Sequence, residues 1–350
     1  MEAMTDQPES SSAVDSACRP PRRRQVAVVY HFFPHYRAGV MKALQQEPSC
    51  DYIFVGDRTD PEGAIKACDS TRFNFLYAPC VMAFGPVLWQ RRILRLAWSN
   101  RIDVMIFLGN ANFLSTWLAA AVARVRGKRV LFWTHGWISD ERGVKAFFRT
   151  CFYSLADGLL LYGKRAKSIA TRHGFSSSRL YVIFNSLDYE VQQAAREAVI
   201  PDELQAVRSK LFGDPSVPVL ICTSRLTPLR GLEQLIEAMR RLRDRGVPSN
   251  LLLVGDGPER ERLENLARRL GVRAHFYGAC YDERRLAELI MAANMTVAPG
   301  QVGLTAIHSL TYGTPVITHG DADYQMPEWE AIEPGKTGDY FRRDDIEDLA

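Results

Sequence analysis

Two arginines, Arg225 and Arg230, are the residues whose type and spacing best suit phosphate chemistry. They lie five residues apart in a segment, 224–231, that follows an apolar run and precedes an amphipathic one. Guanidinium groups stay charged and present paired donors, so two of them can hold a diphosphate from two sides. A solvated turn with incidental arginines is the alternative interpretation.

A glycine-rich turn near the C-terminus suits the same chemistry. Gly300 and Gly303 leave backbone N–H groups uncovered between a predicted strand at 295–298 and a predicted helix at 305–312. Thr305 has the residue type of a helix cap. The unpaired N–H groups and the dipole of a helix start attract anions, although such turns also serve simply to pack a helix against a sheet.

Two further motifs lie at predicted strand ends. Segment 254–258, Val-Gly-Asp-Gly-Pro, has the order strand, glycine turn and helix start. His135 follows a predicted strand at 130–133. A histidine in that position can hydrogen-bond a substrate hydroxyl or transfer a proton, but most histidines do neither, so His135 alone favours a structural role.

Apolar runs and amphipathic segments alternate along the chain on both sides of a pause at 185–188. This alternation favours parallel sheets with helices on both faces, and hence a doubly wound α/β class. The helix predicted at 232–243 carries an apolar stripe that would be buried against the second sheet. The predicted strands are 26–30, 52–55, 73–78, 104–108, 130–133, 158–161 and 181–183 before the pause, and 217–222, 251–254, 274–277, 295–297 and 315–317 after it.

The domain organisation follows from this alternation. We expect a disordered leader at 1–24, an N-terminal Rossmann-like domain at 25–188, a linker at 189–215 and a C-terminal Rossmann-like domain at 216–350. Residues 345–350 have the pattern of an opening helical turn, which predicts a truncated or unusually short last helix. Ligands of such sheets bind beyond the carboxyl ends of the strands, so we expect the site in the cleft between the domains.

The composition excludes several classes of protein. The 350 residues carry a formal net charge of +4 from 44 basic and 40 acidic residues, too small an excess for a nucleic-acid surface. The 7 cysteines form no CxxC pair, which favours a reducing compartment. Residues 1–24 lack the apolar core of a signal peptide, and the uncharged run 104–123 is interrupted at 109–112. We therefore expect a cytoplasmic protein without a membrane span.

Taken in order, these motifs resemble the C-terminal half of the retaining, group-1 GT-B glycosyltransferases, the family 4-like type. The resemblance covers roughly residues 26–350 and is stronger in the second half. The matching segments are Ser-Arg-Leu-(three)-Arg-Gly at 224–231, Val-Gly-Asp-Gly-Pro at 254–258, Phe-Tyr-Gly at 276–278, Ala-Pro-(three)-Gly-Leu-(eight)-Gly-Thr-Pro-Val-Ile at 298–317, Gly-Lys-Thr-Gly at 335–338 and the hinge Asn-Ser-Leu-Asp at 185–188.

The resemblance implies a GT-B fold and the transfer of a sugar from a nucleotide-diphosphate donor to an acceptor hydroxyl, with retention of anomeric configuration. Polysaccharide or glycoconjugate synthesis, with a saccharide or lipid-linked saccharide acceptor, is the implied role. Arg225 and Arg230 would hold the diphosphate, and His135 would approach the donor sugar. The implied donor-binding residues are Gly278, Gly300, Gln301, Val302, Gly303, Leu304, Thr305 and His308, with Ala279 and Cys280 near the base.

The chain departs from the family at two positions where relatives carry glutamates eight residues apart. Gly300 and His308 stand there instead. In relatives the first carboxylate binds the donor sugar and the second the ribose, whereas His308 offers only one ring-nitrogen bond at a time to a diol. Gln301 is the hypothetical substitute for the sugar contact.

No metal and no separate cofactor are expected. Asp321 and Asp323 have the spacing of a metal-binding carboxylate pair, but they lie in a predicted loop. Two rival functions stay open. A non-hydrolysing sugar-nucleotide epimerase would want carboxylates in the cleft for proton abstraction. A partner subunit with a decayed nucleotide site would explain Gly300 and His308, but not the two arginines.

Segment 88–98 is the one candidate for membrane contact. As a helix it would place Trp89, Ile93, Leu96 and Ala97 on one side, with arginines at 91, 92 and 95. Such a helix can lie on an anionic membrane, where a lipid-linked acceptor would be presented. Packing of its aromatic face into its own domain is the favoured alternative.

Overall fold

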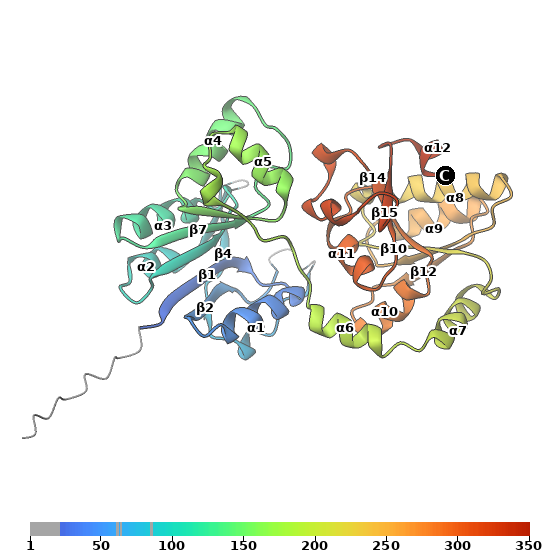
Figure 1. The fold of residues 1–350 in the computed structure, drawn as a ribbon, viewed down its shortest axis with the longest axis horizontal. Coiled ribbons are helices and arrows are strands. Elements are labelled where there is room, and N and C mark those ends of the chain that lie inside the picture. The colour runs from blue at the N-terminus through green and yellow to red at the C-terminus, as the bar shows by residue number, and fades with distance from the viewer. Residues whose placement is uncertain (1–21, 61–62, 64, 85–86) are drawn as a thin grey trace, which may run out of the picture.

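Two parallel α/β sheets lie side by side in the computed structural model, and the chain crosses between them near residue 185 (Figure 1). The structure describes residues 22–60, 63, 65–84 and 87–350. The predicted leader at 1–24 therefore falls almost wholly outside the described residues. The predicted doubly wound α/β class is confirmed.

The N-terminal sheet has the strand order β3-β2-β1-β6-β7-β8-β9, and all its neighbouring strands are parallel. Helices cover both of its faces, and an antiparallel hairpin lies beside it. The strands are β1 (Arg24–Phe32), β2 (Cys50–Asp57), β3 (Phe75–Tyr77), β6 (Val104–Leu108), β7 (Arg129–Thr134), β8 (Gly158–Leu161) and β9 (Leu180–Val182), with the hairpin β4 (Cys80–Phe84) and β5 (Val87–Gln90). The helices are α1 (Ala38–Gln46), α2 (Ile93–Trp98), α3 (Leu114–Val125), α4 (Gly143–Ser154) and α5 (Lys164–Arg172).

The C-terminal sheet has the strand order β12-β11-β10-β13-β14-β15, again parallel throughout. Its strands are β10 (Val219–Thr223), β11 (Asn250–Val254), β12 (Ala274–Gly278), β13 (Met295–Ala298), β14 (Val316–His319) and β15 (Gly338–Phe341). Its helices are α8 (Leu232–Asp244), α9 (Arg260–Arg269), α10 (Glu283–Met291), α11 (Gly303–Thr311) and α12 (Ile346–Leu349). All five residues of β11 are buried, as expected of a strand covered on both faces.

The segment predicted as a linker forms two helices, α6 (Tyr189–Glu197) and α7 (Pro201–Phe212). Both pack on the C-terminal sheet, because Ala195, Val207 and Phe212 belong to the same core cluster as Ile221 and Leu252. The chain therefore joins the C-terminal half as soon as it leaves the hinge. The predicted boundary at 215 stays a prediction.

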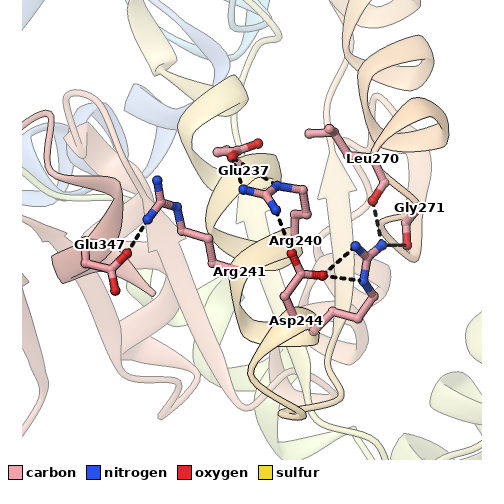
Figure 2. Close-up of polar contacts among 8 residues, drawn as sticks. Glu237, Arg240, Arg241, Asp244, Leu270, Gly271 and Glu347 are labelled. Atoms are coloured by element: carbon pink, nitrogen blue, oxygen red, sulfur yellow. Dashed lines mark hydrogen bonds and ion pairs between the residues drawn. The ribbon is translucent and has the colours of Figure 1, made fainter.

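The apolar stripe predicted at 232–243 is confirmed. Helix α8 buries Leu232, Leu235, Ile236 and Met239 in one cluster with the sheet. Its opposite side carries ion pairs, drawn in Figure 2, that join Arg241 to Glu347 of α12 and Arg240 to Glu237 and Asp244. Exposed pairs of this kind contribute little to stability, so the buried stripe holds the helix in place.

Two local predictions are corrected. Segment 88–98 is not one helix: residues 87–90 form β5, Arg92 has a φ of 68°, and α2 begins only at Ile93. The helix predicted to begin at Thr305 begins at Gly303, and the Thr305 hydroxyl donates to the Thr223 carbonyl at 2.7 Å instead of capping. In both cases a contact with the neighbouring strand or sheet decides the local structure.

The apolar run at 104–123 is divided into β6 and α3, as its central polar residues predict. Among the described residues, no helix has both the length and the apolar character that crossing a bilayer requires.

Candidate functional site

A cavity of about 770 Å³ lies between the two halves, at the carboxyl ends of the C-terminal strands. The loops after β10, β11 and β12 reach it, together with the starts of α10 and α11. The N-terminal half contributes His35, Tyr36, Lys66 and the hinge residues Leu187 and Asp188. The cavity therefore occupies the position that the sequence predicts for a ligand.

Close backbone packing shapes the C-terminal wall of this cleft. A Cβ atom at Gly255 would lie 1.9 Å from the Ser224 carbonyl oxygen, so only glycine fits there. The Leu226 N–H donates to the Asp256 carbonyl at 3.0 Å, which ties the loops after β10 and β11 together. Arg225 is the residue between those contacts, and it lines the cleft.

The start of α11 faces the same cleft. Leu304 and Thr305, in its first turn, line the cavity, and among the described residues no side chain caps the helix. The first N–H groups of an uncapped helix have no partner within the helix, and its dipole favours an anion there. Arg225 and the α11 start together form a site suited to a phosphate.

Arg230 is not among the described residues that line the cleft. Its Nη1 atom donates to the Gln301 carbonyl at 2.7 Å, and the Gly300 N–H donates back to the Arg230 carbonyl at 3.1 Å. Of the two arginines predicted to hold a diphosphate, Arg225 lines the cleft and Arg230 holds the turn that leads into α11. Contact of either with a diphosphate stays a prediction.

The turn residues 300–302 are not among the described residues that line the cavity. A Cβ atom at Gly300 would lie 2.4 Å from the Leu229 carbonyl oxygen, so a glutamate could not occupy this position without moving the backbone. The N–H of the buried Val302 donates to Gln325 at 3.0 Å. Gln301 does not reach the cleft lining within the described chain, so its sugar contact stays a prediction.

His308 lies one turn beyond Leu304 and lines the cleft. Its Nε2 atom is 2.6 Å from a carboxylate oxygen of Glu283, at the start of α10, and the Tyr312 hydroxyl donates to the same oxygen. Burial favours the protonated acid, but the hydrogen bonds from His308 and Tyr312 outweigh it and lower the pKa of Glu283. A carboxylate therefore stands beside His308, 25 residues away in sequence.

Glu283 was missed by the sequence reasoning. An acidic residue in the first turn of a helix is ordinary, because it complements the helix dipole. No spacing pattern connects Glu283 with His308, so only the packing of α10 against α11 reveals the pair. Tyr281 and Gln192 of the cleft lining were missed for the same reason.

Gly278 ends β12 and accepts a hydrogen bond from the Gly255 N–H at 2.8 Å. The following residues, Ala279, Cys280 and Tyr281, line the cleft, and the place of this loop near a base stays a prediction. The Tyr281 ring lies 6.0 Å from the ring of His35, so the two halves of the protein meet at this end of the cleft.

His135 lies at the end of β7, but it lines a separate small pocket at the boundary between the halves, with Gly163, Arg165 and Glu330. Its ring packs edge-on against Tyr162 at 4.8 Å. Burial, and secondarily the charge of Arg37, lower the pKa of His135 to about 4. The imidazole is therefore neutral at physiological pH.

Polar contacts across this boundary hold the halves together. The Glu330 carboxylate accepts the N–H groups of Lys164 and Arg165 at 2.7 and 2.8 Å, and so caps α5 from the other half of the chain. Asn185 of the hinge donates to Glu328. Arg165 pairs with Asp323, one of the two aspartates considered for a metal. Within the described ranges, no group of three or more His, Cys, Asp or Glu residues could hold a metal ion.

The sequence of the C-terminal half is similar to known glycosyltransferases. Residues 205–350 match the family model Glycosyl transferases group 1. A GDP-mannose-dependent alpha-(1-6)-phosphatidylinositol dimannoside mannosyltransferase of Mycobacterium tuberculosis is 35% identical over 109 residues, which are 30% of this chain and 28% of that protein. A glycogen synthase of Leptothrix cholodnii is 33% identical over 158 residues, 39% of this chain and 31% of that protein. The chain thus spans less than a third of these curated relatives.

Solved structures resemble nearly the whole chain. A glycosyltransferase from Rickettsia africae superposes with a TM-score of 0.69 at 16% identity, covering 94% of this chain and 86% of that one. Anabaena HepE in complex with UDP superposes with a TM-score of 0.67 at 15% identity, covering 93% of this chain and 87% of that one. At this identity the likeness concerns the fold.

The two sheets facing a shared cleft have the GT-B fold. Residues 205–350, less than half of the chain, carry the similarity to the glycosyl transferases group 1 family. The predicted resemblance and fold are confirmed.

Proposed function

We propose that this protein transfers a sugar from a nucleotide-diphosphate sugar to an acceptor hydroxyl with retention at the anomeric carbon. The observation that carries the proposal is the convergence of Arg225 and the uncapped α11 start in one interdomain cleft. Charge develops on the leaving diphosphate as the glycosidic bond breaks, and preorganised donors aimed at that charge accelerate the step.

In this proposal Arg225 and the N–H groups at 303–305 hold the diphosphate. Arg230 acts mainly as a positioning residue, since its bond to Gln301 supports the turn from which α11 starts. The base lies near residues 278–280. No metal is required in this proposal, because a cationic side chain and a helix start stabilise the charge instead.

The ribose would meet His308 and Glu283. Because Glu283 binds Nε2 of His308, the other ring nitrogen, Nδ1, is left to accept a ribose hydroxyl. Glu283 would thereby supply the carboxylate that position 308 lacks. The donor-sugar contact stays with Gln301 and the 300–303 backbone, since Gly300 has no room for a side chain.

The acceptor would enter from the N-terminal wall, where His35, Tyr36 and Lys66 line the cleft. His135 would approach the donor sugar once the halves close further, which also excludes water and limits donor hydrolysis. The name of the mycobacterial relative specifies a phosphatidylinositol mannoside, which supports a lipid-linked saccharide as one acceptor class.

The decisive experiment uses a panel of uridine, guanosine and adenosine diphosphate sugars in the absence of metal. We expect one donor to raise the melting temperature and to release nucleotide slowly, with both effects lost in Arg225→Ala. The matched control is Arg268→Ala, on the outer face of α9, which should behave as wild type. Chelator should leave turnover unchanged.

Two results would contradict the proposal. If no donor stabilised the protein, the chain would be better explained as a partner subunit with a decayed nucleotide site. If solvent deuterium entered a sugar carbon without transfer to an acceptor, a sugar-nucleotide epimerase would be the better explanation.

A further inference from the structure

Helix α4 exposes three large apolar side chains to solvent. Val144, Phe147 and Phe148 have 73%, 65% and 59% of their surface accessible, whereas Phe152 and Tyr153 of the same helix are buried. Scattered exposed apolar residues are normal on a protein surface, but a contiguous cluster marks an interaction site. The first half of α4 therefore presents an unpartnered aromatic face.

Helix α3 exposes apolar side chains as well. Leu114, Leu118 and Val125 are 45%, 45% and 85% accessible, and their spacing places them on one side of the helix. The opposite side is packed into the core through Ala119, Ala120 and Ala123. Amphipathic surface helices normally turn polar residues outward, so this arrangement is unusual for a helix in water.

The two helices are neighbours. The Trp117 ring of α3 lies 4.9 Å from the Phe152 ring of α4, and Arg124 of α3 donates to the Leu155 carbonyl after α4 at 3.1 Å. Leu114 lies one turn before Trp117, and Phe148 one turn before Phe152, so both flank this contact. We refer to Leu114, Leu118, Val125, Val144, Phe147 and Phe148 as the α3–α4 surface.

Positive charge surrounds the α3–α4 surface. Residues 80–155 contain 11 basic and 3 acidic residues, a net charge of +8, whereas the whole chain carries +4 and the remainder therefore −4. The helices α2, α3 and α4 contain no acidic residue. Helices α2 and α3 share one core cluster, and Arg95, the arginine of α2, is exposed. The basic residues in and beside these helices are Arg91, Arg92, Arg95, Arg124, Arg126, Arg142, Lys145 and Arg149.

We propose that the α3–α4 surface docks on an anionic membrane. Exposed aromatic and aliphatic side chains enter the headgroup boundary of a bilayer, while surrounding Lys and Arg side chains attract acidic lipids. Protein interfaces are also enriched in aromatic residues and arginine, so the choice of a membrane rests on the concentration of positive charge around the surface, a net +8 over residues 80–155. The inference moves membrane contact from segment 88–98, the sequence-based candidate, to α3 and α4.

The position of the surface suits presentation of an acceptor. The loop between β7 and α4 carries His135, and Arg149 of α4 donates to the Gly136 carbonyl of that loop at 3.3 Å. Docking through α4 would thus place the loop near lipid headgroups. The membrane contact itself is independent of the proposed transferase activity, because it requires neither donor nor turnover.

Vesicle flotation of the full chain tests the inference. We expect binding to vesicles of phosphatidylcholine with phosphatidylglycerol, little binding to pure phosphatidylcholine, and weakening with added salt. Phe147→Ser combined with Phe148→Ser should lower the bound fraction at least about tenfold, since two large apolar side chains no longer enter the bilayer. The matched control is Ile200→Ser with Val247→Ser, which removes exposed apolar side chains from the C-terminal half and should bind as wild type.

Unchanged melting temperature and donor stabilisation in the Phe147 and Phe148 variant would show that its fold and donor site are intact. The inference would be overturned if the wild type failed to float with anionic vesicles, or if both double variants lost binding equally. It would also be overturned if the wild type were a dimer that became monomeric in the Phe147 and Phe148 variant, because the surface would then join two copies of the chain.

Discussion

The C-terminal wall of the cleft is built largely from backbone, whereas the N-terminal wall consists of side chains from irregular segments. On the first, Gly255 packs against the Ser224 carbonyl and α11 presents uncapped N–H groups. On the second, His35 and Tyr36 extend from a single 3-10 turn and Lys66 from an irregular segment. Backbone contacts tolerate few residue types, while a loop can change its side chains freely. The first wall suits an invariant group such as a diphosphate, and the second suits a variable acceptor.

The largest expected effect tests how closely the backbone is packed in the C-terminal wall of the cleft. Gly255→Ala would place a Cβ 1.9 Å from a carbonyl oxygen at a φ of +148°, and it should lower the free energy of unfolding by more than about 3 kcal/mol. Gly246→Ala is the control, with a φ of +78° and nothing within 4 Å, and it should cost about 1 kcal/mol. Chemical denaturation measures both, and equal costs would contradict close packing at Gly255.

The next effect concerns pH and two histidines of the N-terminal half that lie outside the cleft lining. The pKa of His135 is about 4, below its unfolded value of about 6.5, so the unfolded chain binds more protons between these values. The contribution of the neutral, buried His135 to the free energy of unfolding is complete above pH 6.5. It decreases as the pH falls, by roughly 3 kcal/mol at pH 4. His31, with a pKa of about 4, should add to the loss.

Unfolding free energies measured from pH 7 to pH 4.5 test this expectation. His135→Gln should flatten the dependence on pH, whereas the exposed control His35→Gln should keep the wild-type slope. If the slope of His135→Gln matched that of wild type, burial of a neutral His135 would not explain the acid sensitivity.

A smaller effect separates the roles of the two walls. Arg225→Ala removes a charge-assisted contact worth about 1.5–3 kcal/mol and should weaken donor binding roughly 10- to 100-fold. Lys66→Ala, on the opposite wall, should change donor affinity less than about threefold, because exposed charges contribute little. Calorimetry with the stabilising donor measures both constants. Equal losses would remove the assignment of donor and acceptor to separate walls.

The smallest expected effect concerns Glu283, a side chain of the C-terminal wall of the cleft. Glu283→Gln should raise donor KM about fivefold and leave kcat nearly unchanged, since it removes about 1 kcal/mol of ground-state binding through His308. The control is Glu288→Gln, further along α10, where the carboxylate pairs with Arg285. A fall in kcat with unchanged KM would indicate that Glu283 acts in the chemical step instead.

Much of the donor wall could be predicted because its motifs reflect backbone constraints. Gly255 and the 300–303 turn, read from the sequence, lie where strand ends meet helix starts. Contacts between side chains were harder to predict from the sequence. The bond from Arg230 to the Gln301 carbonyl was not expected, and neither was Glu283 beside His308. Such contacts depend on helix packing, which leaves no spacing pattern in the chain.

Segment 88–98 of the N-terminal half also shows that tertiary contacts cannot be predicted from a local pattern. Its periodicity matched an amphipathic helix, yet pairing of β5 with β4 takes residues 87–90 into a hairpin. The exposed aromatic face lies on α4 instead, where Phe147 and Phe148 follow no pattern that distinguishes them from core residues. Local periodicity cannot tell which apolar face finds a partner.

The sequence by itself determined the α/β class, the order of the strands along the chain and the glycine turns at their carboxyl ends, because period and residue type depend on local geometry. Only the tertiary structure decided which of these turns share a cleft, which arginine faces it and which carboxylate stands beside His308. Those outcomes depend on contacts between residues far apart in the chain, such as Glu283 with His308 and Glu330 with the start of α5, and such contacts exist only after the sheets and helices have packed.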